Sequence, residues 1–190
     1  MRPTALVVID VQRAAFDGQV CPPIANAQAL LNRVAALIAG ARAAGIAVLH
    51  VQHCGPAGDA FAEGSERAEI HPDVAPRGDE PVLRKHASSA FDDTAIESLL
   101  DAAGIGRIVV CGLQSDQCVC NTSLGALARG FSVLVAQDAH STWPSGNDSA
   151  EFIVERYNQL LERQGARLLD TADAIALFAE ARSSAAGAAT

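Results

Sequence analysis

Three side chains suited to nucleophilic and acid–base chemistry follow apolar, strand-like runs in this 190-residue sequence. Asp10 ends the first run, Lys85 follows the third, and Cys118 comes shortly after the fourth. A carboxylate can move a proton, an ammonium group can hold that carboxylate, and a thiol can attack a carbonyl carbon. Because ligands bind beyond the carboxyl ends of parallel strands, we expect the three groups to share one rim of a sheet.

Each of these residues also has an ordinary structural interpretation. On position alone, Asp10 fits a helix cap or a loop-fixing residue as well as it fits a carboxylate that faces a ligand. Lys85 taken alone is typical of a solvated lysine, and Cys118 taken alone fits a buried cysteine in a first helical turn. The chemical interpretation gains weight because all three residues map to the same rim.

The turn that leads to Cys118 carries the sharpest signal. Gly112 permits unusual backbone angles, and Ser115 or Asp116 can cap a helix. In a first helical turn, unpaired N–H groups and the helix dipole favour an anion. We therefore expect a lowered pKa for the Cys118 thiol, and an oxyanion site on the same N–H groups.

The elements that must position these groups alternate between strand and helix. Apolar runs predict strands at 5–9, 46–52, 82–84, 107–112, 131–137 and 166–169. Helical periodicity and glycine stops predict helices at 24–44, 92–103, 116–129, 149–164 and 171–181. The alternation predicts an α/β fold of three layers, in which helices cover both faces of a mostly parallel sheet.

Length and composition favour a single domain over residues 1–182, followed by a flexible tail at 183–190. Apolar residues make up 49% of the chain, which is enough for a core and excludes a disordered chain. A net charge of −8 without a basic run argues against a nucleic-acid partner. No apolar stretch approaches the ~20 residues that cross a bilayer. With five cysteines and no signal peptide, we expect a soluble, cytoplasmic protein.

One connection is too long for the usual loop. Residues 53–80 form a stretch of 28 residues, rich in glycine, proline and charge, without clear periodicity. Ordered loops longer than about 15 residues are often lids or binding loops, so we expect an active-site loop here. A surface insertion without a function is the alternative.

These motifs resemble those of the isochorismatase-like cysteine hydrolases, a family that includes nicotinamidases, N-carbamoylsarcosine amidase and ureidoacrylate amidohydrolase. The family's Asp-x-Gln matches Asp10-Val11-Gln12, and its lysine after the third strand matches Lys85. Its Gly-apolar-x-Ser/Thr-x-x-Cys-Val segment matches Gly112 to Val119. Further matches are Phe16, Ser89-Ala90-Phe91, Thr122, Gly130 and Asp138-Ala139. The resemblance extends from about residue 4 to residue 180.

The resemblance implies a six-stranded sheet of order 3-2-1-4-5-6. The first and fourth strands are then neighbours at the switch point, where Asp10 and the helix of Cys118 meet. The resemblance also implies a cis peptide bond between Leu113 and Gln114. This bond would turn the N–H of Gln114 inward beside that of Cys118, so that the two form an oxyanion hole.

A reaction is implied as well. Asp10 takes the proton of Cys118, Lys85 holds Asp10, and the thiolate attacks a small amide, imide or ureide to form a thioester. Isochorismatases proper cleave a vinyl ether without a nucleophile, so Cys118 favours C–N hydrolysis over that alternative. The residues expected to contact substrate are Gln12, Phe16, Phe61, Leu113 and Trp143. Gln12 either binds substrate or orients Asp10, and packing of loops onto the body is the alternative for the aromatic residues.

We expect no metal and no other cofactor. Nicotinamidases of the family bind a divalent ion through an Asp-x-His segment after the second strand and through further histidines. Here the segment reads Gln52-His53-Cys54-Gly55, and His53 with His71 makes too few ligands. This difference also argues against nicotinamidase activity. His140 is expected to be a solvated loop histidine.

Other classes of protein remain as alternatives. A non-catalytic or regulatory subunit would keep the fold, but the set of Asp10, Lys85 and Cys118 argues against it. A redox protein would use Cys118 and Cys120, whose spacing on a helix points the side chains in different directions. A dinucleotide-binding enzyme would need a Gly-x-Gly-x-x-Gly after the first strand, which the chain lacks. Analogy with the family favours a homodimer or larger homo-oligomer that acts on a small-molecule amide.

Overall fold

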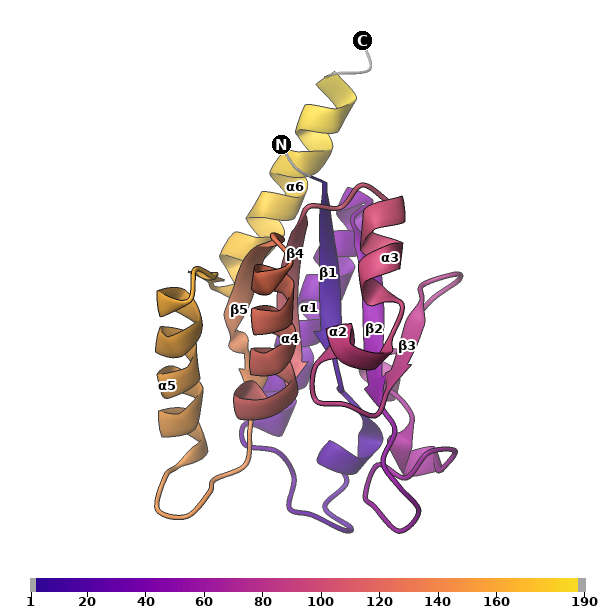
Figure 1. Cartoon of the computed structure of the whole chain (residues 1–190), viewed down its shortest axis with the longest axis vertical. Coiled ribbons are helices and arrows are strands. Elements are labelled where there is room, and N and C mark those ends of the chain that lie inside the picture. Colours follow the sequence, from indigo (N-terminus) through magenta and orange to yellow (C-terminus); the bar gives the residue numbers. More distant parts are fainter. Residues whose placement is uncertain (1–2, 188–190) are drawn as a thin grey trace.

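The computed structural model describes residues 3–187 of the chain, which form a sheet of six strands with helices on both sides (Figure 1). The strands are β1 (Thr4–Ile9), β2 (Ala47–His53), β3 (Val82–Lys85), β4 (Arg107–Leu113), β5 (Ser132–Ser141) and β6 (Arg167–Leu169). They lie in the order β3-β2-β1-β4-β5-β6, and every neighbouring pair is parallel. The predicted fold class and strand order are confirmed.

Helices cover the sheet in two layers (Figure 1). They are α1 (Ala27–Ala44), α2 (Ala90–Asp93), α3 (Ile96–Ala102), α4 (Cys120–Ala128), α5 (Ala150–Arg163) and α6 (Thr171–Gly187). The cores on the two faces show that α1 and α6 pack on one face, and α3, α4 and α5 on the other. Short helical turns are η1 (Arg13–Ala15), η2 (Glu66–Ala68), η3 (Pro72–Val74) and η4 (Ser115–Val119). Among the described helices, none is both long and apolar enough to cross a membrane.

The first strand shows how the sheet is buried on both faces. All six residues of β1 are buried. Leu6 and Val8 belong to the core that includes Phe178 of α6, whereas Val7 belongs to the core that includes Leu100 of α3. Because successive side chains of a strand point to opposite faces, a continuous apolar run is what this position in the sheet requires.

Three helices differ clearly from the predicted ranges, and the helix expected at 24–44 begins only at Ala27. The helix expected at 92–103 is broken into α2 and α3 at Thr94, whose Oγ1 donates to the carbonyl of Ala90 at 2.6 Å and accepts from the N–H of Ile96 at 3.1 Å. The helix expected at 116–129 begins as the π-helical turn η4. The last helix continues beyond 181 to Gly187, in keeping with the high helix propensity of alanine. The segment expected to be a flexible tail is thus helical as far as Gly187, and residues 188–190 lie outside the described residues.

The approach of β4 to β1 depends on Gly112. Its φ of +115° lies in the region that favours glycine, and a Cβ atom there would lie 2.0 Å from the carbonyl oxygen of Ile9. Ile9 and Gly112 are paired across the two central strands. Since Asp10 directly follows Ile9, this close contact sets the distance between Asp10 and the turn that follows β4.

Replacing Gly112 with alanine should push these two strands apart. We expect Gly112→Ala to lower the free energy of unfolding by about 3 kcal/mol or more, as measured by urea denaturation. Gly130→Ala is the matched control, because Gly130 also has a positive φ (+83°) but nothing lies within 4 Å of an added Cβ. The control should lose only about 1 kcal/mol. Equal losses in the two variants would contradict the steric argument.

Candidate active site

A carboxylate, an ammonium group and a thiol meet at the carboxyl ends of the central strands. Lys85 Nζ lies 2.8 Å from Asp10 Oδ2 and 3.1 Å from Cys118 Sγ. It also donates to the carbonyl of Ala87 at 3.2 Å. The Lys85 side chain is completely buried, so these three acceptors take up the three hydrogens of its ammonium group.

The backbone after β1 places Asp10 beside the lysine. The N–H of Asp10 donates to the carbonyl of Val51 at 2.9 Å, which keeps the residue in line with the sheet. Its φ of +51° then turns the chain out of the strand, a conformation that aspartate tolerates better than most residues. The second carboxylate oxygen, Oδ1, is buried and makes no hydrogen bond with any described residue. This oxygen therefore has free capacity to accept a proton.

A wide helical turn carries Cys118. In η4 the N–H of Val119 donates to the carbonyl of Gln114 at 3.0 Å, a hydrogen bond that spans five residues. Such π-helical turns occur often at functional sites. The peptide bond between Leu113 and Gln114 is cis.

His140 braces this turn from the adjacent strand. It is buried on β5, where Nδ1 lies 2.7 Å from Ser115 Oγ and Nε2 lies 2.8 Å from Asn158 Oδ1. Burial lowers the pKa of His140, so the ring is neutral at pH 7. The expectation of a solvated loop histidine is wrong, because β5 continues to Ser141 and buries the ring.

A cavity of about 420 Å³ opens above these groups. The residues around it are Asp10, Cys21, His53, Asp59, Ala60, Phe61, Ser88, Leu113, Gln114, Gln117, Cys118 and Trp143. The structure thus brings Phe61, Leu113 and Trp143 to the pocket that contains Cys118. The long connection at 53–80 supplies part of the wall through His53 and Asp59 to Phe61.

Two residues expected to contact substrate lie elsewhere. Gln12 is completely buried, and its Nε2 donates to the carbonyls of His53 and Ala68 at 2.9 and 2.6 Å, while its Oε1 accepts from the N–H of His53 at 2.9 Å. With its amide fully engaged, Gln12 fastens the loop and does not line the cavity. Phe16 packs edge-on against His71, with ring centroids 5.0 Å apart, and is also absent from the described wall.

Sequence reasoning missed several wall residues. Ser88 Oγ lies 4.0 Å from Cys118 Sγ and accepts a hydrogen bond from Asn121 Nδ2 at 2.8 Å. The position of Ser88, three residues after Lys85, is the sequence feature that could have indicated its place at the site. From the sequence, His53 is a candidate metal ligand and not a wall residue. Among the described residues, neither His53 nor His71 belongs to a group of three potential ligands. Cys21 had no local signal, because the chain after η1 reads as an ordinary loop.

The charges of the three central groups are coupled. Burial raises the pKa of Asp10, and only part of this rise is offset by Lys85. Burial and the charge of Asp10 raise the pKa of Cys118 to about 11. Burial alone would lower the pKa of Lys85, but Asp10 and the thiol outweigh it and raise that pKa. The expected lowering of the thiol pKa is therefore wrong, because burial and the charge of Asp10 outweigh Lys85 and keep the proton on the sulfur.

Comparison with known proteins gives a consistent result. Residues 4–173 match the family model described as the isochorismatase domain. The chain is 38% identical over 151 residues to streptothricin hydrolase of Streptomyces noursei, across 78% of this chain and 54% of that protein. It is 30% identical over 106 residues to maleamate amidohydrolase of Pseudomonas putida, across 55% of this chain and 50% of that protein. The chain thus spans about half the length of these two relatives.

The fold has solved relatives as well. An isochorismatase-family structure from Burkholderia xenovorans LB400 superposes with a TM-score of 0.88 at 33% identity. The superposition covers 95% of this chain and 90% of that one. The resemblance inferred from the motifs is confirmed.

The coupling of charges can be measured by alkylation of Cys118. We expect its reaction with iodoacetamide, followed by mass spectrometry of the Cys118 peptide, to keep rising above pH 9 because the thiol pKa is near 11. Asp10→Asn should shift the profile to lower pH, since the Asp10 charge raises the thiol pKa. Asp59→Asn, in the same pocket, is the control and should leave the profile in place. A plateau below pH 8, or a profile indifferent to Asp10→Asn, would contradict this view.

Proposed function

The chain belongs to the isochorismatase family, and from that premise we propose that it is a cysteine hydrolase that cleaves a C–N bond of a small amide, imide or ureide. The observation that carries the proposal is the contact of the Cys118 thiol with a buried acid and a buried ammonium group beside a cavity. The names of the relatives support it, since one is a hydrolase and another an amidohydrolase.

In the first half of the proposed reaction, the thiol proton of Cys118 passes to Asp10 as the sulfur attacks the carbonyl carbon. The S–C bond forms and the carbonyl oxygen becomes an oxyanion. The backbone N–H groups of Gln114 and Cys118 are the proposed donors to it, because both residues line the cavity and early N–H groups of a helical turn lack partners within the turn. The C–N bond then breaks, and Asp10 gives its proton to the leaving nitrogen.

The second half of the proposed reaction releases the acyl group from Cys118. Asp10, again ionised, takes a proton from a water molecule that attacks the thioester carbonyl. The S–C bond breaks, the product leaves as a carboxylic acid or its equivalent, and the proton on Asp10 returns to the sulfur. Lys85 keeps its charge throughout, and so stabilises whichever of the two partners is negative.

The wall of the cavity favours neutral or cationic substrates. Phe61, Leu113 and Trp143 supply apolar surface, while Asp59 supplies a carboxylate. Among the described residues around the cavity, none is an arginine or a lysine. A substrate carboxylate would therefore find no positively charged side chain at the wall to pair with. An amide without a negative charge needs no such partner, and so its binding would not be disfavoured.

Removal of the nucleophile tests the proposal. A panel of neutral, cationic and anionic small amides is first screened for ammonia or amine release by the wild-type protein. On a substrate found in this way, Cys118→Ala should lower kcat by a factor of about 10⁴ or more. Cys120→Ala, which removes a buried thiol two residues away, should keep kcat within a few-fold.

The thioester itself can be trapped. Acid quenching of the wild-type protein during turnover should leave the acyl group on the Cys118 peptide, detected by mass spectrometry. Full activity of Cys118→Ala, or hydrolysis with no acyl group on any cysteine, would rule out this reaction. Preference for anionic amides would overturn the assignment of substrate charge.

A further inference from the structure

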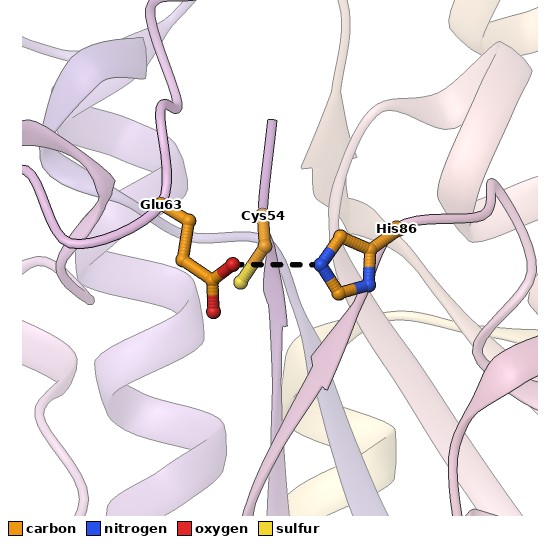
Figure 2. Close-up of side chains that lie close together, drawn as sticks. All are labelled: Cys54, Glu63 and His86. Carbon is orange, nitrogen blue, oxygen red and sulfur yellow. Dashed lines mark ion pairs between the residues drawn. The ribbon is translucent and has the colours of Figure 1, made fainter. Parts of the chain in front are cut away.

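A second group of metal-binding side chains lies beside the catalytic pocket and takes no part in the proposed reaction. Cys54 follows β2, Glu63 lies in the long connection, and His86 follows β3 (Figure 2). One ligand atom from each lies within 4.8 Å of the other two. Among the described residues, this is the group of three whose ligand atoms come so close together. We propose that Cys54, Glu63 and His86 form a binding site for Zn²⁺ or a similar divalent ion.

The separation of two of the three ligand atoms already fits one tetrahedral ion. Ligand atoms bound to zinc at about 2.0–2.3 Å lie about 3.4–3.6 Å from each other. Glu63 Oε2 and His86 Nε2 are 3.6 Å apart, which is too long for a good hydrogen bond but close to the separation of two zinc ligands (Figure 2). Small movements of the exposed Glu63 and His86 side chains would bring both to the buried sulfur of Cys54.

A carboxylate lies near the far ring nitrogen of His86, on the side where metal-bound histidines usually have a hydrogen-bond partner. His86 Nε2 faces Glu63, while its Nδ1 lies 3.6 Å from Asp93 Oδ2. Asp93 is itself held by the N–H groups of His86 and Ala87, which donate to Oδ2 at 2.7 and 3.1 Å. A short movement of the ring would let Nδ1 donate to this carboxylate and would leave Nε2 for the ion.

Backbone hydrogen bonds hold the three segments together. The N–H of Cys54 donates to the carbonyl of Lys85 at 2.8 Å, so that Cys54 and His86 stay adjacent. The N–H of Glu63 donates to the carbonyl of Gly55 at 3.1 Å, which returns the long connection to Cys54. The framework of the site is thus present before an ion binds, and less ordering is needed on binding.

The chemistry of the ligands selects the ion. A thiolate, an imidazole and a carboxylate suit zinc better than magnesium or calcium, which prefer oxygen ligands alone. A thiolate and a carboxylate would neutralise the two positive charges of the ion. Arg84 Nη1, now 3.7 Å from Glu63 Oε1, is too distant and too exposed to hold that carboxylate firmly.

The site is separate from the catalytic group but touches the same wall. It borders its own hollow, which shares His53 with the catalytic pocket. A bound ion would tie the connection that carries Asp59 and Phe61 to the ends of β2 and β3. We therefore expect zinc to stiffen the pocket wall and to raise the melting temperature.

Cobalt titration of the tag-free, chelator-treated full chain tests the site, because thiolate ligation of Co²⁺ gives a charge-transfer absorption band. We expect one equivalent of Co²⁺ per chain, displaced by Zn²⁺. His86→Ala, an exposed position, should weaken binding at least about tenfold. Glu63→Gln should weaken it too, whereas Glu66→Gln, an exposed glutamate of the same connection, is the matched control and should bind like wild type.

The catalytic thiol is the competing metal ligand, so Cys118→Ala separates the two sites. The proposal requires that Cys118→Ala keeps the band and that Cys54→Ser loses it. Absence of a stoichiometric band in wild type, a band lost in Cys118→Ala, or a band unchanged by His86→Ala would each overturn the site. None of these outcomes bears on the hydrolase proposal, which is tested by turnover and by the trapped thioester.

Discussion

The candidate site depends on the burial of one ammonium group. Lys85 lies on the edge strand β3, two strands away from β1, and its side chain reaches Asp10 across the end of β2. An unpaired buried ammonium would cost several kcal/mol, so the fold must supply partners. Asp10, Cys118 and the carbonyl of Ala87 are those partners. The acid and the thiol are therefore brought together by the requirements of folding, before any substrate arrives.

Burial and the charges around Lys85 also determine the pKa values of Asp10 and Cys118. Burial is the main reason why the pKa values of Asp10 and Cys118 are both raised, and the charge of Asp10 raises the pKa of Cys118 further. The resting sulfur is a neutral thiol, which is a poor nucleophile and resists oxidation. In the proposed reaction, the sulfur becomes reactive when its proton crosses to the neighbouring carboxylate. The proposed reaction thus couples activation of the sulfur to its attack on a carbonyl carbon in the cavity.

Local patterns predicted most of the fold, because apolar runs and glycine stops reflect burial that each segment undergoes by itself. They failed where partners far away in the chain decide the structure. Strand β5 continues to Ser141, whereas the sequence predicts that the fifth strand ends at Gln137 and that Asp138 and His140 lie in a loop. Their side chains instead bond to Asp170, Thr171 and Asn158, whose positions no local pattern reveals. The gathering of Asp10, Lys85 and Cys118 at one rim of the sheet is predictable, since the strand ends of a parallel sheet meet at one edge. The pKa values of these residues are not predictable from the sequence, because they depend on burial.

The Asp-x-Gln motif shows how one short segment serves both the chemistry and the wall of the pocket. Asp10 turns toward Lys85, while Gln12, two residues later, bonds to backbone atoms of His53 and Ala68, 41 and 56 residues away in the chain. From the sequence, a polar residue so close to the acid could be a substrate ligand, yet Gln12 is completely buried and both hydrogens of its amide are donated to backbone carbonyls. By holding both His53 and Ala68, it fixes the start and the middle of the connection that carries Phe61. The position of the pocket wall is therefore set from the same turn that positions the acid, so that the cavity and the reacting groups keep a constant relation to each other.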